Sequence, residues 1–133
     1  MSILAVMADL MFSVRIIDAA KKLGLSVAFV KDHDAFARKL KDAPSLVIFD
    51  LNYQPADPLS LIRQIKSDPA AKDIPTVAFV SHVQADLRRA AEDAGCDHVI
   101  ARSAFAQSLP EILKQQFSGT PEPPASASSF SGE

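Results

Sequence analysis

The 133-residue sequence has few of the residues on which small metal-bound, disulfide-bonded or nucleotide-binding proteins depend. It contains one cysteine, Cys96, which excludes an intramolecular disulfide and a zinc site made only of cysteines. Of its four glycines only Gly24 and Gly95 precede residue 117, so there is no glycine-rich loop to hold a nucleotide phosphate. No apolar run approaches the ~20 residues that span a bilayer.

The sequence also lacks a surplus of positive charge. It has 14 basic and 16 acidic residues, and two of the acids, Glu122 and Glu133, lie in a terminal segment without a basic residue. The two signs therefore balance in the remainder of the chain, which argues against nucleic acid as a partner. The apolar start, residues 1–10, contains Asp9 and lacks both a basic region and a cleavage site. We expect a cytoplasmic protein with no membrane partner.

Five short apolar runs, rich in Val, Ile and Phe, do not alternate strictly with polar residues. This pattern is typical of parallel strands that are covered on both faces. Successive runs begin 20 to 30 residues apart, which leaves room for a helical crossover and is too long for a hairpin. The predicted strands are residues 3–6, 25–30, 46–49, 76–80 and 98–101.

The segments between these runs have the apolar spacing and the terminal residues of helices. In the first, Leu10, Val14, Ile17 and Ala20 recur at steps of four and three, and Gly24 follows. We predict that this set, with Met7 and Met11, packs in the core. The other helices are predicted to begin at Asp34, at Asp57-Pro58, near Gln84 (ending at Gly95) and at the capping-box sequence Ser108–Glu111, with Phe117 in the last one.

The order is thus strand–helix repeated five times, which predicts an α/β doubly wound, five-stranded parallel sheet with five helices. Residues 1–117 would form this single domain. The remaining segment, 118–133, holds three prolines and five serines and only one large apolar residue, Phe130. We predict that it is a disordered tail, and we expect no output domain after the sheet.

Ligands of open parallel sheets bind beyond the carboxyl ends of the strands. The polar residues that follow the predicted strands are Asp9, Asp50, Ser81 and Arg102. A carboxylate, a hydroxyl and a cation that converge at one edge are the groups of a phosphoryl site. His82, beside Ser81, has no partner at diagnostic spacing and is predicted to be a loop residue. No nucleophile elbow G-x-S-x-G occurs, so we expect no enzymatic activity.

Three segments make the sequence resemble a response-regulator receiver domain over about residues 2–117. They are SLVIFDL, which places Asp50 at the position of the phosphoacceptor, IKSDPAAKDIPTVAFVSH, with Ser81 at the hydroxyl position, and AEDAGCDHVIARSAF, with Arg102 at the lysine position. The resemblance implies the strand order 2-1-3-4-5 and a role in two-component phosphorelay signalling. It further implies a protein partner, either a histidine kinase or a downstream effector, and it leaves the oligomeric state open.

The departures from the family pattern are concentrated in the phosphorylation site. The acidic pair that holds Mg²⁺ in the family falls on Met7 and Ala8, and only Asp9 and Asp50 remain as carboxylate ligands. Any Mg²⁺ binding is therefore expected to be weak. Arg102 could pair permanently with Asp50, and Ser81 could instead cap the following helix. The aromatic switch residue falls on Val99.

We therefore expect a stand-alone, receiver-like signalling protein with a degenerate phosphorylation site, which acts by protein–protein docking. One alternative is a functional response regulator that a histidine kinase phosphorylates at Asp50. Another is a flavodoxin-like FMN or nucleotide binder, which the missing glycine loop disfavours. In the resemblance the contact surface involves the last strand and its neighbouring helices, which here places Arg88, Arg89, Ser103 and Phe105 on the partner surface.

Overall fold

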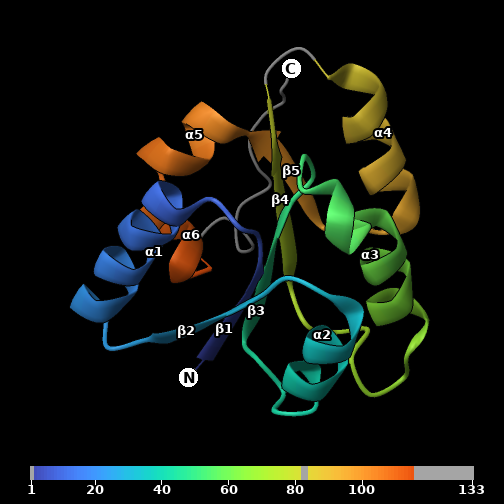
Figure 1. Ribbon diagram of the computed structural model, residues 1–133, viewed down its shortest axis with the longest axis horizontal. Coiled ribbons are helices and arrows are strands. Elements are labelled where there is room, and N and C mark those ends of the chain that lie inside the picture. Colours follow the sequence, from blue (N-terminus) through green and yellow to red (C-terminus); the bar gives the residue numbers. More distant parts are fainter. Residues whose placement is uncertain (1, 82–83, 116–133) are drawn as a thin grey trace.

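A computed structural model describes residues 2–81 and 84–115. The protein is an α/β sandwich around a five-stranded, entirely parallel sheet in the order β2-β1-β3-β4-β5 (Figure 1). Both the fold class and the strand order agree with the prediction. The strands are β1 (Ser2–Val6), β2 (Ser26–Val30), β3 (Leu46–Asp50), β4 (Thr76–Val80) and β5 (His98–Ala101).

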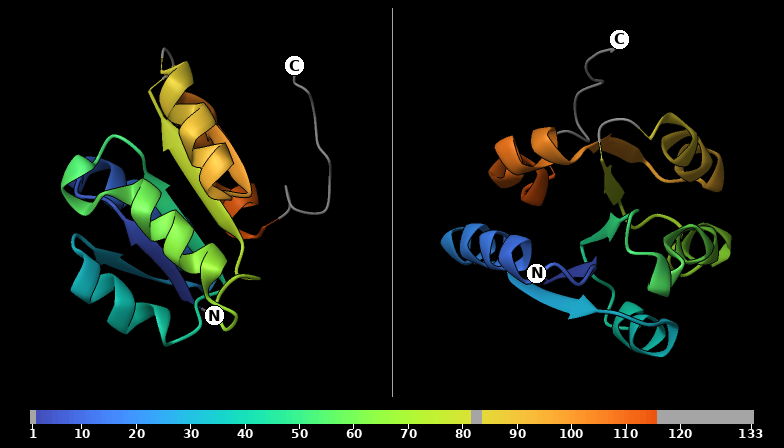
Figure 2. Two further views of the ribbon diagram at one scale, coloured as in Figure 1. Left: turned by 90° about the vertical axis from the view of Figure 1, so that its right-hand side faces the viewer. Right: turned by 45° about the horizontal axis from the view of Figure 1, so that its top comes forward.

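Helices cover both faces of the sheet (Figures 1 and 2). One face carries α1 (Leu10–Lys22), α5 (Arg102–Gln107) and α6 (Leu109–Leu113), and the other carries α2 (His33–Leu40), α3 (Pro58–Ser67) and α4 (Ala85–Ala94). A short 3₁₀ turn, η1 (Gln54–Ala56), precedes α3. Within the described residues, none of these helices has the length and apolar character to cross a membrane.

Two hydrophobic cores lie on opposite sides of the sheet. Every residue of the central strands β3 and β4 is buried, which explains why these strands have continuous apolar sequences. Phe36 and Phe49 belong to the core under α2, α3 and α4, with ring centroids 6.1 Å apart. Phe12, Phe79 and Phe105 form an aromatic cluster in the other core, with centroids 4.9–5.7 Å apart.

The C-terminal region has one helix more than predicted. α5 begins at Arg102, directly after β5, because Phe105 is fully buried against Phe12 and Phe79 and draws this segment onto the sheet. The predicted capping box does not form: Ser108 precedes α6 but makes no capping hydrogen bond with its side chain. Phe117 and the predicted tail, 118–133, lie outside the described residues, as does His82.

Most of the predicted helix ends are correct, including the starts of α3 at Pro58 and of α4 after Gln84, but the predicted cap of α2 is wrong. Gly24 and Gly95 follow α1 and α4 with positive φ angles of 73° and 107°, which favours glycine. The N-cap of α2 is Asp32, not Asp34: its side chain accepts a hydrogen bond of 2.8 Å from the amide of Ala35. Asp34 lies in the first turn, exposed, where its charge still favours the helix.

The predicted core face of α1 is correct for Ala20 and wrong for Leu10, Val14 and Ile17. Phe12, Ile16 and Ala20 are the buried residues, whereas Leu10, Val14 and Ile17 point to solvent. Met7 is buried as predicted, but Met11 is 82% exposed. Both sets of apolar residues have helical spacing, so the periodicity alone does not choose between them. The choice follows from Phe12, whose ring packs edge-on against Phe79 at 5.2 Å.

The orientation of α1 predicts opposite outcomes for two neighbouring isoleucines. Ile16→Ala should lower the free energy of unfolding by about 2–4 kcal/mol, because it opens a cavity in the core. Ile17→Ala removes the same atoms from a surface position and should cost less than about 1 kcal/mol. Urea denaturation at low micromolar concentration measures both. Equal losses would mean that the buried face of α1 is misassigned.

Candidate functional site

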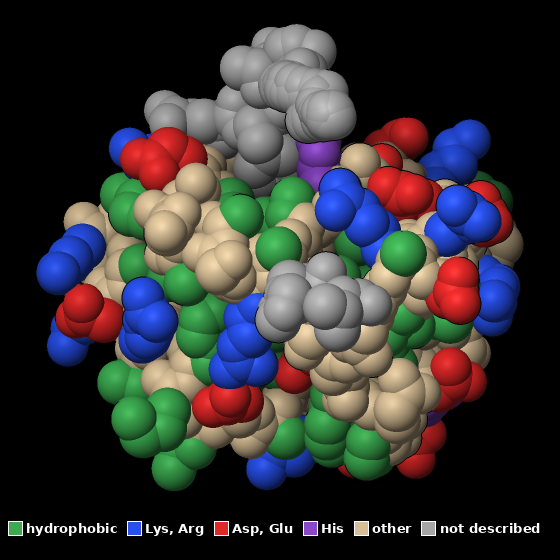
Figure 3. Space-filling view, turned by 90° about the horizontal axis from the view of Figure 1, so that it is seen from above, with side chains coloured by type: hydrophobic (Ala, Val, Ile, Leu, Met, Phe, Trp, Pro, Cys, Tyr) green, Lys and Arg blue, Asp and Glu red, His purple; other side chains and the backbone are tan. Residues whose placement is uncertain are grey.

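The polar residues expected to converge do lie at the carboxyl edge of the sheet. Asp50 ends β3, Ser81 follows β4, Asp9 precedes α1 and Arg102 begins α5. Viewed onto this edge, hydrophobic side chains are interspersed with those of both charges (Figure 3). The structure thus brings together residues 21 to 93 positions apart, through parallel strands that all end at the same edge.

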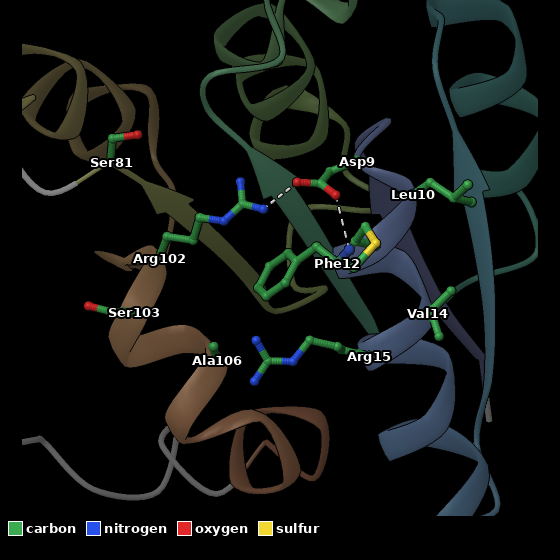
Figure 4. A pocket seen from close by; sticks show the side chains of 10 residues that line it. Asp9, Leu10, Phe12, Val14, Arg15, Ser81, Arg102, Ser103 and Ala106 are labelled. Atoms are coloured by element: carbon green, nitrogen blue, oxygen red, sulfur yellow. Dashed lines mark hydrogen bonds and ion pairs between the residues drawn. The ribbon is translucent and has the colours of Figure 1, made fainter.

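Asp9 joins two helices through its side chain. One carboxylate oxygen, Oδ1, accepts a hydrogen bond of 3.0 Å from the amide of Phe12 and so caps α1. The other, Oδ2, forms an ion pair with Nη2 of Arg102 (Figure 4). The Phe12 amide and then the Arg102 guanidinium hold the pKa of Asp9 below its usual value. Both oxygens are therefore engaged with groups of the protein itself.

Arg102 is held in place by aromatic rings as well as by charge. Its guanidinium carbon lies 4.5 Å from the ring centroid of Phe12 and 5.7 Å from that of Phe79. From the start of α5 the side chain crosses the Phe12 ring to reach Asp9 (Figure 4). The hypothesis that Arg102 pairs with Asp50 is therefore wrong, because Asp9 is its ion-pair partner.

Asp50 is a largely buried carboxylate, with 7% of the residue exposed. Its Oδ1 accepts a hydrogen bond of 2.9 Å from the amide of Asn52. Burial raises the pKa of Asp50, and the negative charge of Asp9 adds to this effect. The Asn52 amide and the nearby charge of Arg102 act in the opposite direction without cancelling the rise. The surroundings of Asp50 therefore disfavour its ionised form.

Asn52, which the sequence patterns did not indicate as a site residue, joins the loop after β3 to the loop between β4 and α4. Its Oδ1 accepts hydrogen bonds from the amide (3.1 Å) and the hydroxyl (3.4 Å) of Ser81. Its Nδ2 donates to Oε1 of Gln84 at 2.5 Å. Ser81 is not the cap of α4, which begins at Ala85 after Gln84. The sequence feature that could have indicated this role is an asparagine in the loop two residues after Asp50, because short polar side chains in such loops often form hydrogen bonds to backbone groups nearby.

The residues present do not fit the divalent metal site that the family resemblance implies. Met7 is in the core, Ala8 contributes only a methyl group, and both oxygens of Asp9 are already bonded. Residues 2–81 and 84–115 contain no cluster of three or more His, Cys, Asp or Glu side chains that could hold a metal. Mg²⁺ requires several oxygen ligands in near-octahedral geometry, and Asp50 alone does not supply them.

Of the four residues predicted to face a partner, three are exposed. Arg88, Arg89 and Ser103 lie on the surface, and Arg88 pairs with Glu92 one turn further along α4, at 3.7 Å. Phe105 is wrong as a contact residue because it is completely buried in the aromatic cluster. Its apolar side chain stabilises α5 against the sheet instead.

A hollow of about 870 Å³ opens between α1 and α5, beside the Asp9–Arg102 pair (Figure 4). Its walls are mostly apolar, and Arg15 lies across it from Ala106 (Figure 4). The sequence did not predict this hollow, because Leu10, Met11 and Val14, which line it, were predicted to lie in the core. The lining residues are Asp9, Leu10, Met11, Phe12, Val14, Arg15, Ser81, Arg102, Ser103 and Ala106.

Asp50→Asn should stabilise the protein at neutral pH. Because the pKa of Asp50 is raised in the folded protein, its ionised carboxylate destabilises the fold at any pH above that pKa. The destabilisation disappears below the lower pKa that the same carboxyl group has in the unfolded chain. Asparagine keeps an acceptor for the Asn52 amide and carries no charge. The gain in unfolding free energy over the wild type should be present at pH 7 and should vanish near pH 3. A gain that is independent of pH would contradict this origin.

Comparison with known proteins places these observations in context. No protein-family profile matches the sequence, and no curated protein matches it. Solved structures do match. The phosphorylated cyanobacterial phytochrome response regulator RcpA is 26% identical, with a TM-score of 0.71 over 86% of this chain and 89% of its own.

Two further solved structures are similar over more than nine tenths of this chain. The receiver domain of a histidine kinase from Syntrophus aciditrophicus is 20% identical, with a TM-score of 0.75 over 95% of this chain and 96% of its own. The Mn²⁺-bound form of response regulator Rcp1 is 18% identical, with a TM-score of 0.73 over 92% and 99%. With its strand order and the position of Asp50, the chain is a receiver-like domain with the fold of response regulators and a divergent sequence.

Proposed function

We propose that this protein is a receiver-like signalling domain of two-component type that acts by docking to a protein partner, with a degenerate phosphorylation site. The observation that carries the proposal is the ion pair between Asp9 and Arg102. It engages the only acidic side chain left in the loop after β1 and the only cation at the lysine position. Neither group is then available to a phosphoryl group on Asp50.

Phosphoryl transfer to a carboxylate requires that the charge on the phosphoryl oxygens be neutralised as it develops. In this site the metal ligands are reduced to Asp50, since Asp9 is bonded through both oxygens and Met7 is in the core. If Arg102 contacted a phosphoryl group on Asp50 instead, the Asp9 carboxylate would lose its ion-pair partner. The site residues therefore support slow phosphorylation or none.

The rest of the site favours one fixed arrangement. The hydroxyl and the amide of Ser81 face Asn52, which also contacts Gln84 at the start of α4. Val99 is buried in the core beneath α4 and carries no ring that could move between two positions. A phosphoryl group shifts a two-state equilibrium only by its differential affinity for the two states. Because these contacts already hold the site in one arrangement, a phosphoryl group would have little differential affinity for a second one.

Docking to a partner would use surfaces that remain available in this arrangement. We propose a histidine kinase or a downstream effector as the partner, in line with the receiver fold. The exposed side chains of Arg88, Arg89 and Ser103 support contacts next to β5 and α5. Arg89 has no ion-pair partner among the described residues, so its charge is available to an acidic group of the partner.

The central experiment measures phosphorylation directly. After incubation with acetyl phosphate and Mg²⁺, intact mass spectrometry should show no phosphoryl adduct on the wild type, and Asp50→Asn serves as the blank. The double substitution Ala8→Asp/Arg102→Lys restores a carboxylate at an exposed position and the compact ammonium group. This variant should acquire the adduct at least about 10-fold faster. An adduct that forms equally fast on the wild type and is absent from Asp50→Asn would establish the functional phosphoacceptor instead.

A second experiment tests the fixed arrangement. Beryllofluoride mimics a phosphoryl group, and its addition with Mg²⁺ should leave the amide chemical shifts of residues 84–107 essentially unchanged. The weak metal site and the absence of an aromatic ring at Val99 are the physical reasons. Two-dimensional ¹H–¹⁵N NMR measures the shifts. A concerted change across α4, β5 and α5 would show that the domain is a working switch.

A further inference from the structure

The hollow between α1 and α5 has the size and the wall chemistry of a small-molecule site. Its volume of about 870 Å³ lies within the range of roughly 300–1,000 Å³ that such sites occupy. Most of its wall is apolar, and the charged side chains that line it are those of Asp9, Arg15 and Arg102. An apolar wall with a few charged groups is typical of sites that bind a small molecule with one polar end.

The domain itself does not pair one of these charges. The side chain of Arg15 points into the hollow, across from Ala106 (Figure 4). Among the described residues Arg15 has no ion-pair partner, and its side chain contacts the ring of Phe12, 5.8 Å from the guanidinium carbon. Asp18, one turn further along α1, pairs with Lys22 at 3.2 Å instead. Arg15 therefore offers a positive charge and a planar set of donors to a group that enters the hollow.

The charges of the hollow favour an occupant with a single negative charge. Asp9 and Arg102 neutralise each other in their ion pair, so the two arginines and one aspartate of the lining leave a formal charge of +1, on Arg15. A carboxylate matches this charge and can accept two parallel hydrogen bonds from a guanidinium. A phosphate monoester carries about −1.5 to −2 at neutral pH, which is more than one free cation balances. The polar end of the occupant is therefore best matched by a carboxylate.

Met11 supplies a wall for the apolar end of such a ligand. It lies one turn before Arg15 on the same line of α1, and it is 82% exposed, so the core of the domain does not use its side chain. The flexible thioether chain of methionine adapts to irregular apolar partners. Ala106, which is half-buried on α5, and the ring of Phe12 also line the hollow near Arg15. An unbranched alkyl chain can follow this wall.

We propose that the hollow between α1 and α5 is a binding site for a fatty acid of medium chain length. The carboxylate of the acid pairs with the guanidinium of Arg15. Its alkyl chain lies along Met11, Phe12 and Ala106. Asp50 does not line the hollow, so binding of the acid does not depend on whether Asp50 is phosphorylated. The site is thus a function in addition to the docking proposed above.

Titration of the full chain with sodium decanoate, followed by two-dimensional ¹H–¹⁵N NMR, tests the site. The amide shifts of residues 9–15 and 102–106 should change saturably, with a dissociation constant below about 1 mM. Octanoate should bind more weakly, by about 2- to 3-fold for each methylene group that it lacks. Decyltrimethylammonium has the same chain with a positive end and should not cause these shifts. No saturable change up to about 2 mM decanoate, or equal binding of the cation, would overturn the proposal.

Substitutions test the two ends of the ligand separately. Arg15→Gln should raise the dissociation constant for decanoate about 5- to 10-fold, because the ion pair is lost. Its matched control, Arg63→Gln, removes an exposed arginine of α3 on the other face of the sheet and should change nothing. Met11→Glu places a carboxylate in the apolar wall and should abolish binding, whereas Ile17→Glu, on α1 but outside the hollow, should not. Circular dichroism confirms that each variant is folded. Equal effects within either pair would contradict the assigned contacts and overturn the proposal.

The competing occupant is the C-terminal segment of the chain, which contains the apolar Phe130 and the acids Glu122 and Glu133. Deletion of 116–133 distinguishes the two occupants. If the site takes a free fatty acid, the deletion should leave unchanged both the amide shifts of residues 9–15 and 102–106 and the affinity for decanoate. If the deletion alone shifts these amides and tightens the binding of decanoate, the C-terminal segment fills the hollow and the proposal is wrong.

Discussion

The ion pair between Asp9 and Arg102, formed across the ring of Phe12, organises the carboxyl edge of this domain. It joins the start of α1 to the start of α5, two helices that pack side by side over β1, β3 and β4. Asp9 is at once the cap of α1 and the counterion of Arg102. Because the pair is partly shielded by Phe12 and Phe79, its geometry is set by packing as well as by charge.

The same pair explains the chemistry that the site can and cannot perform. In the receiver pattern the carboxylates after the first strand serve a metal, whereas here the one remaining acid serves an arginine. Asp50 then stands alone as a buried carboxylate with a raised pKa, held mainly by the amide of Asn52. An ionised carboxylate in this environment lowers the stability of the fold, because burial disfavours its charge.

α1 connects the site to the outer surface. Asp9 and Phe12 at its start belong to the site, and its outer side exposes Leu10, Val14 and Ile17 to solvent. Leu10 and Val14 also line the hollow between α1 and α5, so this apolar surface borders the Asp9–Arg102 pair.

The sequence by itself determined the five parallel strands, the fold class and the edge at which Asp9, Asp50, Ser81 and Arg102 meet. These features depend on local signals: buried Val- and Ile-rich runs, glycines such as Gly24 at helix ends, and the rule that parallel strands end at one edge. The strand order came from the resemblance to receiver domains, since pairing among parallel strands leaves no local signal in the sequence.

Tertiary structure alone decided which groups contact one another. Leu10, Val14 and Ile17 recur at helical spacing just as the buried Phe12, Ile16 and Ala20 do, and only the packing of Phe12 against Phe79 orients α1. That orientation in turn directs Arg102 to Asp9 rather than to Asp50. Periodicity records that a helix has an apolar face, but the choice among faces and among ion-pair partners depends on the shapes of residues far apart in the chain.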